Sequence, residues 1–373
     1  MSGPKRQGVS GYGNAYAKHR YYHSHKPDRV LSSDNDRLAM CRLAFADVEK
    51  ATVCDYEINS GGTSYTYLTC RYFREQYPDA EIFWLVGTDM LRNFPMWKNP
   101  VSILEDVTLA VCGRNDEEGW WEKEETDFYR LFRKKFVRVD CNGADVSSTK
   151  IRVMAGAGMR LTDFVDEKVE KYIQENGLYK IQGAKEALAL EKPSRQEHSV
   201  RVAWFAAAHA SKCKVSERKA ITAALFHDCG KNLLADSPYL KGFSLPTEWG
   251  TVPVSVWHQF AGAYVAEHVF GVDDEDILNA IRYHTSGRPN MSNLEKLIFL
   301  ADMLEEERSY DCVDELRELF KQDLDTCLEE ALYQTLLFLE RKKADVYPLT
   351  AQAYAYIKEE NKKMGDNYGT GKQ

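Results

Sequence analysis

The sequence predicts two domains of different fold class, an α/β domain with a parallel sheet followed by an all-α domain. The chain has 373 residues, which exceeds the size of a single ordinary core. Between residues 50 and 180, short β-rich runs alternate with helical stretches, as in a sheet built from βαβ units. Beyond about residue 196 the strand signal stops, and only helical periodicity continues.

Strands are predicted where short apolar runs are bounded by Gly, Asn, Asp or Pro, at Ala51–Ile58, Glu81–Gly87, Val107–Cys112 and Phe136–Cys141. Helices are predicted at Arg37–Val48, Tyr65–Gln76, Ser148–Ala155 and Glu167–Asn176. This alternation predicts a parallel sheet covered on both faces, in a domain that spans residues 25–181. Residues 1–24 form a basic tail without an apolar run that could serve as a strand, and we expect this tail to be disordered.

The second domain is expected to contain helices alone. A polar connector at residues 182–192, with Gly183 and neighbouring Lys and Glu residues, precedes it. Helical stripes are predicted at 198–212, 217–229, 254–270, 274–284, 293–306, 321–343 and 349–363. We therefore place the all-α domain at residues 193–347 and a C-terminal helix and tail at residues 348–373.

The composition excludes several classes of protein. Hydrophobic residues make up 44% and charged residues 28% of the chain, which rules out global disorder. The sequence has no long apolar run and no secretory signal at its start, and its net charge of −8 argues against general nucleic-acid binding. We expect a cytoplasmic protein without nucleic-acid or membrane partners, and the oligomeric state stays open. The nine cysteines form no C-x-x-C pair and are expected to be reduced thiols.

The clearest chemical signal is the adjacent pair His227-Asp228, which ends a long apolar run. An ionised Asp beside such a run needs a cation or hydrogen-bond donors. Other His and Asp residues also lie on apolar helical faces: His198, His258, His284 and Asp302. A histidine on an apolar face is more often a core residue bonded to a backbone carbonyl, and we prefer that interpretation for His209 and His268. The spacing alone therefore leaves a metal site and satisfied core histidines as alternatives.

The order of these residues resembles that in the HD-domain metallophosphohydrolases. The H…HD…D pattern comprises His198, His227-Asp228 and Asp302. Four segments further resemble the bacterial HD enzymes that split diadenosine tetraphosphate symmetrically: His227 to Lys231, His258 to Ala263, Ala280 to Thr285, and Ala301-Asp302 followed by Glu305 and Arg308. The resemblance covers roughly residues 190–345.

This resemblance implies a site with two divalent metal ions, with iron expected and Mn or Zn as alternatives. His198, His227, Asp228 and Asp302 would hold one ion. His258 and His284 would complete the second, with Asp228 between them. Two ions can polarise a phosphoryl oxygen and activate water. Lys231 and Arg308, assigned with Asp228 to catalysis, would neutralise the phosphates, although solvated helix ends are the alternative. Thr285 and Gly287 are expected to line the substrate pocket.

Residues 20–180 resemble nicotinate-nucleotide adenylyltransferase. The matching pieces are His25-Lys26, Arg37 to Met40, Ser64 to Thr66, Gly87-Thr88-Asp89, Trp97, Ser147 to Thr149, Ile151-Arg152, Val169, Tyr172-Ile173 and Leu178-Tyr179. The resemblance implies a Rossmann-like nucleotidyltransferase fold that would bind ATP with Mg and nicotinate mononucleotide. Nucleotide-binding residues would be Gly87, Asp89, Trp97, Ser148, Thr149 and Arg152. An ordinary N-cap at Ser148-Thr149 and ordinary packing of Trp97 are the alternatives.

The opening strand and the G-x-F-x-x-x-H-x-G-H segment of that family are absent. His19, His23 and His25 do not reproduce its spacing. A wrongly chosen start or truncated chain, a domain that has lost its activity, and a tail with another role are three explanations, and we favour the first. We expect impaired transferase activity, because this segment holds the ATP phosphates.

The sequence therefore predicts a metal-dependent hydrolase that cleaves diadenosine tetraphosphate to two ADP, fused to an adenylyltransferase-like domain of NAD biosynthesis. One alternative makes the adenylyltransferase the main activity and the HD domain accessory. Another makes the first domain a non-catalytic nucleotide-sensing module. Cyclic dinucleotides, guanosine tetraphosphate and nucleoside triphosphates stay open as substrates of the HD domain.

Overall fold

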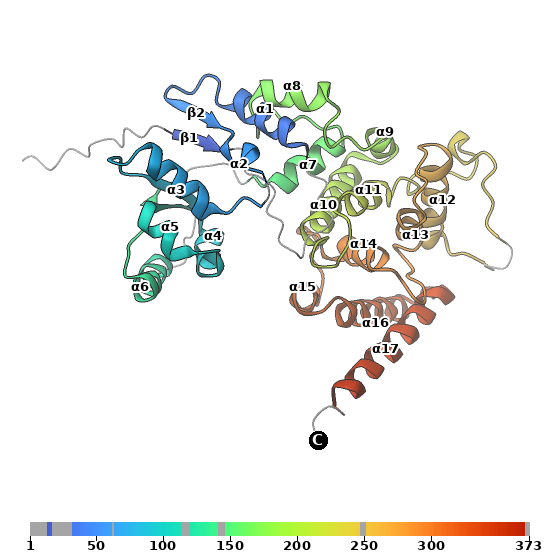
Figure 1. Cartoon of the computed structure of the whole chain (residues 1–373). Helices are drawn as coiled ribbons and strands as arrows, with labels where there is room; N and C mark the ends of the chain where they lie inside the picture. Colours follow the sequence, from blue (N-terminus) through green and yellow to red (C-terminus); the bar gives the residue numbers. More distant parts are fainter. Residues whose placement is uncertain are drawn as a thin grey trace, which may run out of the picture. The chain divides into compact units, whose positions relative to one another are not determined.

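The structure is a computed structural model that describes residues 13–16, 32–61, 63–113, 119–140, 146–246 and 251–369 (Figure 1). For residues 13–16 and 364–369 it describes the backbone only. The described residues fall into two compact units, one that ends at Val146 and one that begins at Ser147. The first unit contains strands and helices and the second contains helices alone, which confirms the predicted fold classes.

The strands of the first unit form two parallel sheets. The larger sheet has the order β3-β4-β5, formed by β3 (Phe83–Gly87), β4 (Thr108–Cys112) and β5 (Val137–Val139). The smaller sheet pairs β1 (Gly13–Tyr16) with β2 (Ala51–Cys54). All three strand pairs are parallel, as the strand-helix alternation predicted, and consecutive strands are connected through helices.

The strand β1 corrects one prediction. Its four residues lie within the tail at residues 1–24, where the sequence predicted no strand. They pair in register with β2, so that Gly13 lies opposite Ala51 and Tyr16 opposite Cys54. The segment of β1 reads GNAY and contains no histidine. The rest of the predicted tail, and His25-Lys26 of the adenylyltransferase resemblance, lie outside the described residues.

The helices of the first unit are α1 (Asp34–Ala44), α2 (Tyr56–Asn59), α3 (Thr66–Gln76), α4 (Thr88–Asn93), α5 (Pro100–Asp106) and α6 (Trp120–Phe132), with a 3-10 turn η1 (Phe94–Met96). Helix α1 begins at a capping box in which Ser33 and Asp36 bond each other's backbone. Helices α4, α5 and α6 were not predicted. The strand expected to continue to Ile58 ends at Cys54, and α2 follows it.

The second unit contains α7 (Ser148–Gly156), α8 (Glu167–Glu175), α9 (Ala184–Leu188), α10 (Pro193–His209), α11 (Glu217–Phe226), a 3-10 turn η2 (Pro238–Leu240), α12 (Val254–His268), α13 (Glu275–Arg282), α14 (Asn293–Leu304), α15 (Val313–Gln322), α16 (Leu324–Lys342) and α17 (Pro348–Gly369). The helix predicted at 321–343 is α16, and the helix α15 that precedes it was not predicted. Asp323 separates α15 from α16, and its side chain accepts a hydrogen bond from the Thr326 N–H at 2.7 Å. No helix among the described residues is long and apolar enough to cross a membrane.

Helices α7 and α9 belong to the core of the helical unit. Val153, Ala157 and Leu188 lie in one buried cluster with residues of α10, α11 and α14. Along the chain, the boundary between the two compact units therefore lies between Val146 and Ser147. The sequence places the domain boundary at residues 182–192 instead. That boundary and the other predicted domain limits stay predictions.

One cysteine departs from the expected reduced state. Cys112, the last residue of β4, is disulfide-bonded, so the prediction of reduced thiols is wrong for this residue. Seven other described cysteines are free, at positions 41, 54, 70, 213, 229, 312 and 327.

Candidate metal centre

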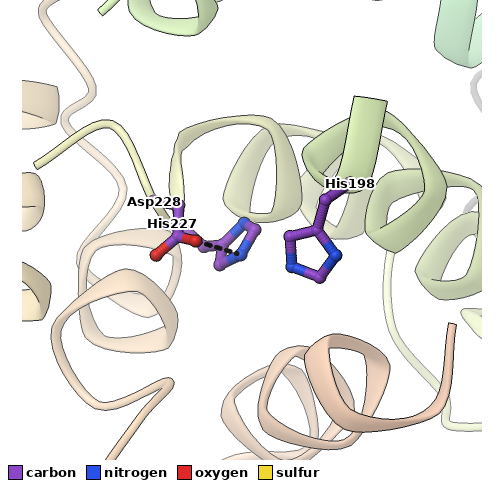
Figure 2. A group of neighbouring side chains, drawn as sticks. All are labelled: His198, His227 and Asp228. Atoms are coloured by element: carbon purple, nitrogen blue, oxygen red, sulfur yellow. Dashed lines mark ion pairs between the residues drawn. The ribbon is translucent and has the colours of Figure 1, made fainter. Parts of the chain in front are cut away.

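Six predicted ligands from the second unit lie together. His198 projects from α10, His258 from α12 and Asp302 from α14, while His227, Asp228 and His284 directly follow helices. Ligand atoms within 4.8 Å of one another form three groups: His198, His227 and Asp228; His227, His284 and Asp302; Asp228, His258 and His284. Figure 2 shows His198 pointing toward His227 and Asp228, although α10 and α11 are separate helices.

The end of α11 explains how Asp228 reaches His258. Helix α11 is buried along most of its length and ends at Phe226 inside the core, so the next residues turn within the protein. Gly230 then lies against α12, where an added Cβ would be only 2.5 Å from the His258 carbonyl oxygen and from the Gly262 nitrogen. Only glycine permits this approach. It places Asp228 Oδ1 3.3 Å from His258 Nε2.

Backbone carbonyls determine which ring nitrogen carries the proton in two of the histidines, His227 and His284. The Nδ1 of His227 donates to the Ala224 carbonyl at 2.7 Å, and the Nδ1 of His284 donates to the Ile281 carbonyl at 2.8 Å. Each Nε2 is thereby left without a proton. The sequence left carbonyl-bonded core histidines as the alternative to metal ligands. In both residues Nδ1 bonds a carbonyl while Nε2 can bind a metal, so the two interpretations are compatible.

Two buried polar atoms of this cluster lack a hydrogen-bond partner. These atoms are His227 Nε2 and Asp228 Oδ1, both inaccessible to solvent. Buried polar groups are normally satisfied, so such atoms require an explanation. An unprotonated imidazole nitrogen and a carboxylate oxygen are both acceptors, and a divalent cation satisfies both. The residues present therefore fit a metal ion.

Asp228 lies between two sets of histidines. Its Oδ1 is 3.3 Å from His258 Nε2 and 3.5 Å from His284 Nε2, whereas its Oδ2 is 3.6 Å from His227 Nε2. Burial alone would raise the pKa of Asp228, but the neighbouring imidazoles of His227, His258 and His284 hold it well below its ordinary value. The carboxylate is therefore ionised, with one oxygen facing each set.

Burial also keeps two of the histidines neutral. It lowers the pKa of His227 to about 4 and that of His258 to about 4. Neutral imidazole is the form that binds a metal. The histidines are thus in a ligand-competent state at neutral pH.

Asp302 and His198 form the other side of the centre. Asp302 Oδ1 lies 2.8 Å from His198 Nε2, and Arg308 donates to the same oxygen at 2.6 Å. Burial opposes the ionisation of Asp302, but the neighbouring imidazoles of His198 and His227, together with the Arg308 guanidinium, lower its pKa far below the ordinary value. Glu305 meets the opposite ring nitrogen of His198, Nδ1, at 3.1 Å.

Three cationic side chains surround these ligands. Lys231 Nζ is 2.9 Å from His258 Nε2 and 3.6 Å from Asp228 Oδ1, and Arg308 contacts Asp302 as described. Arg195, which the sequence did not single out, donates to Asp228 Oδ2 at 3.0 Å. Its position three residues before His198 on α10 puts both on one helical face, and this spacing was the signal that could have identified it.

Of the two pocket residues predicted after His284, Thr285 lies at the metal centre and Gly287 packs against a neighbouring helix. Thr285 Oγ1 is 3.1 Å from His258 Nε2. Gly287 has a φ of +64° and lies against Ala353, so a Cβ there would be 3.3 Å from the Ala353 Cβ. Its expected place in a substrate pocket stays a prediction, and its packing favours a structural role.

Gln259 was also missed, although it shapes this segment. Its Oε1 accepts from the backbone N–H of Thr285 at 3.0 Å and of Ser286 at 3.1 Å, and its Nε2 donates to the Ser286 hydroxyl. A buried amide next to a ligand histidine gave no pattern by which the sequence could distinguish it from any other core residue.

The nucleotide-binding residues predicted for the first domain divide between the two units. In the first unit, Gly87 ends β3 and Asp89 is the second residue of α4, at the carboxyl end of the sheet where parallel folds bind ligands. Trp97 packs against Phe94, with ring centroids 5.2 Å apart. Part of the Trp97 side chain is therefore used in packing, as the alternative to nucleotide binding predicted.

In the second unit, Ser148, Thr149 and Arg152 belong to α7. Ser147 rather than Ser148 caps the helix, accepting from the Lys150 N–H at 3.1 Å. Arg152 Nε donates to Glu217 at 2.6 Å and its Nη2 to the Thr149 hydroxyl at 3.2 Å. Arg152 and Glu217 are both buried. The guanidinium predicted to meet phosphate thus already has a carboxylate partner.

The fold and the centre together define a helical HD-type metal-binding unit that follows an α/β nucleotidyltransferase-like unit. Residues 195–307 match the HD domain family, and residues 15–154 match the cytidylyltransferase-like family. The HD match includes all six residues of the centre. An HD domain with these His and Asp groups is a divalent metal site.

Curated relatives match each half and the whole. A symmetrical bis(5'-nucleosyl)-tetraphosphatase of Bacillus subtilis is 38% identical over 178 residues, which cover 46% of this chain and 96% of that protein. A probable nicotinate-nucleotide adenylyltransferase of Opitutus terrae is 34% identical over 155 residues, covering 42% of this chain and 76% of that protein. A protein of Mycoplasma genitalium, named probable nicotinate-nucleotide adenylyltransferase/Ap4A hydrolase, is 28% identical over 84% of this chain and 86% of its own length.

The chain belongs with its second half to the HD-domain family of symmetrical bis(5'-nucleosyl)-tetraphosphatases and with its first half to the nicotinate-nucleotide adenylyltransferase family. Its arrangement of the two domains is that of the Mycoplasma relatives.

Proposed function

We propose that the second half hydrolyses diadenosine tetraphosphate symmetrically. One water is consumed, the central anhydride bond is broken, and two ADP molecules are formed. The observation that carries the proposal is the convergence of four histidines and two aspartates into overlapping ligand groups on either side of Asp228. The names of the relatives in Bacillus subtilis and Mycoplasma genitalium support the choice of substrate.

The centre would hold two divalent ions, with iron as the expected metal and Mn or Zn as alternatives. His198, His227, Asp228 and Asp302 would hold one, and Asp228, His258 and His284 the other. When bound, such ions polarise phosphoryl oxygens and activate water at neutral pH. No side chain of the chain is required as a covalent nucleophile.

The cationic side chains would bind the tetraphosphate. The chain carries a net charge of −8, so an anionic substrate depends on local positive charge. Lys231, Arg308 and Arg195 supply that charge at the ligands themselves, and each is about one-third exposed. Thr285, with its hydroxyl at His258, would orient a phosphate oxygen.

The test is product identification with the full chain. The protein is loaded with Fe²⁺ or Mn²⁺ and incubated with diadenosine tetraphosphate, and the products are separated by ion-exchange chromatography. ADP alone supports the proposal. ATP plus AMP would exclude symmetrical cleavage, and hydrolysis of guanosine tetraphosphate or a cyclic dinucleotide in preference would replace the substrate.

For the first half we propose an adenylyltransferase-type domain, using ATP with Mg and nicotinate mononucleotide, whose activity is impaired in this chain. The Gly-His segment that holds the ATP phosphates in that family is absent from the sequence, and Arg152 is paired with Glu217. The chain with Mg²⁺ and both substrates should form little or no nicotinate adenine dinucleotide. Robust synthesis would make the transferase the main activity instead.

A nucleotide-sensing first half is the remaining alternative. It predicts that ATP binds without turnover, which equilibrium dialysis with labelled ATP would detect. The cytoplasmic location expected from the sequence stays a prediction.

A further inference from the structure

Glu305 is a buried carboxylate beside the centre to which neither the sequence nor the proposed mechanism assigns a role. It caps the end of α14 and is 2% exposed. We propose that Glu305 is a positioning residue: it holds the proton of His198 on Nδ1, and thereby leaves Nε2 free to bind a metal ion. This inference rests on the proposed function, since it takes His198 as a ligand.

His198 differs from His227 and His284 in what orients its ring. The latter two follow helix ends, where the carbonyl three residues earlier is free to accept from Nδ1. His198 lies inside α10, where the preceding carbonyls are already bonded within the helix. Its Nδ1 contacts an acceptor from another element instead.

Glu305 supplies that acceptor from a position 107 residues away, with its Oε1 3.1 Å from His198 Nδ1. An ionised carboxylate only accepts hydrogen bonds, so it selects the tautomer with the proton on Nδ1. The Nε2 then faces Asp302 at 2.8 Å. Two acceptor atoms at that distance are a suitable pair for one cation, and a carboxylate behind a ligand histidine also strengthens its bond to a metal.

Glu305 is itself held in place from two sides. Its Oε2 accepts from Arg201 Nε at 2.9 Å and from the Glu307 N–H at 2.9 Å. The backbone carbonyl of Glu305 accepts from Arg317 at 2.7 Å. Arg201 lies three residues after His198 on α10, so the histidine and the anchor of its carboxylate move together. This bracing fixes the Oε1 position.

The experiment measures metal affinity apart from turnover. Mn²⁺ binding to the full chain is measured by isothermal titration calorimetry for the wild type, Glu305→Gln, Glu305→Ala and, as a matched control, the exposed Glu306→Gln. We expect affinity roughly 10–100-fold weaker for both Glu305 variants, the range typical of such supporting partners, and wild-type affinity for the control. In Glu305→Gln the amide NH₂ faces either His198 or the N–H donors of Arg201 and Glu307. In the first orientation it cannot accept from His198 Nδ1, and in the second it opposes two donors. Neither orientation supports the tautomer as the carboxylate does.

A spectroscopic measurement keeps the inference testable if a variant fails to fold. In the Zn²⁺-loaded wild type, ¹⁵N NMR should show His198 with a protonated Nδ1 and a metal-bound Nε2. Metal bound through Nδ1, or Glu305 variants that bind Mn²⁺ as well as the wild type, would overturn the inference and leave the proposed function standing. A wild type that binds no Mn²⁺ at all would overturn both.

Discussion

The residues of the metal centre combine two histidines that are kept neutral, His227 and His258, with two carboxylates that are kept ionised, Asp228 and Asp302. Burial lowers the pKa of His227 and His258, whereas neighbouring histidines and cations outweigh burial at Asp228 and Asp302. Such opposite shifts in one buried cluster are typical of functional sites. They also mean that removal of one carboxylate changes the binding of the whole cluster.

Asp228→Asn tests this dependence. The substitution keeps the shape of the side chain but removes the charge that lies between the two sets of histidines. We expect loss of bound metal and a fall of more than about 100-fold in hydrolysis of diadenosine tetraphosphate. Metal content by mass spectrometry and the rate of ADP formation are the measurements. The exposed Asp236→Asn is the control, and full metal content in Asp228→Asn would contradict the assigned centre.

Glu191 predicts a pH dependence of stability. Burial raises its pKa to about 8, although Ser199 donates to it at 2.8 Å. The folded chain therefore keeps a proton that the unfolded chain releases above its ordinary pKa of 4.5. The contribution of Glu191 to the free energy of unfolding is full below about pH 4.5 and is lost as the pH rises toward 8.

Glu191→Gln removes this titration. In metal-free buffer, the difference in free energy of unfolding between wild type and Glu191→Gln should fall with rising pH by up to about 1.4 kcal/mol per pH unit between pH 5 and 8. Urea unfolding at each pH measures it. Parallel curves for the two proteins would show that Glu191 ionises normally.

At the scale of elements, α11 joins two polar features of the helical unit. Its first residue, Glu217, pairs with Arg152 of α7, and its end leads into His227-Asp228. The residues from Ala220 to Phe226 are all buried, so most of the helix is fixed in the core. The pairing of Arg152 is a tertiary feature that its place in an adenylyltransferase-like motif did not indicate.

Arg152→Met should destabilise the chain by roughly 3 kcal/mol, because it leaves the buried Glu217 carboxylate without its arginine. Arg152→Met combined with Glu217→Met should recover most of that loss, since two apolar side chains can replace a buried pair. Urea unfolding measures both. The exposed Arg130 of the Asp127 pair provides the control, and Arg130→Met should stay within about 0.5 kcal/mol of wild type. Equal effects of Arg152→Met and Arg130→Met would show that burial of the pair is unimportant.

At the scale of the whole molecule, sequence families and packing units divide the chain differently. The cytidylyltransferase-like match extends to residue 154, yet α7 lies in the compact helical unit that begins at Ser147. Val153, Ala157 and Ile181 bury their side chains in the helical core. A division near residue 185 would therefore cut through α9 and expose this surface.

Two shortened chains test this assignment. Residues 147–373 should unfold at a higher temperature than residues 186–373, because the shorter chain loses α7, α8 and the buried side chains of Ile181 and Ala184. Differential scanning calorimetry at matched metal content measures the difference. Equal melting temperatures would place the packing boundary at the predicted connector, residues 182–192, after all.

Local signals in the sequence were sufficient for most elements and ligand types. Repeated apolar spacing and caps predicted α10 to α14, and apolar runs with flanking turn residues predicted β3 and β4. Short segments such as α4 and α5, and the helix α15, escaped prediction because their local patterns are weak compared with their tertiary contacts. The strand β1 escaped for the same reason, since its residues have little strand propensity and it is defined by pairing with β2.

The candidate metal ligands could be named because their residue types and order resemble the HD family, whereas their positions on apolar helical faces alone left core histidines as an alternative. Their partners could not be named, because a hydrogen bond such as Glu305 to His198 joins residues 107 positions apart and leaves no local pattern. The sequence alone therefore determined two domains of different fold class and indicated six candidate metal ligands in the second. Packing in three dimensions decided which carbonyl or carboxylate orients each histidine, that Arg195 meets Asp228, and that Arg152 is paired with Glu217, because these depend on which helices lie side by side.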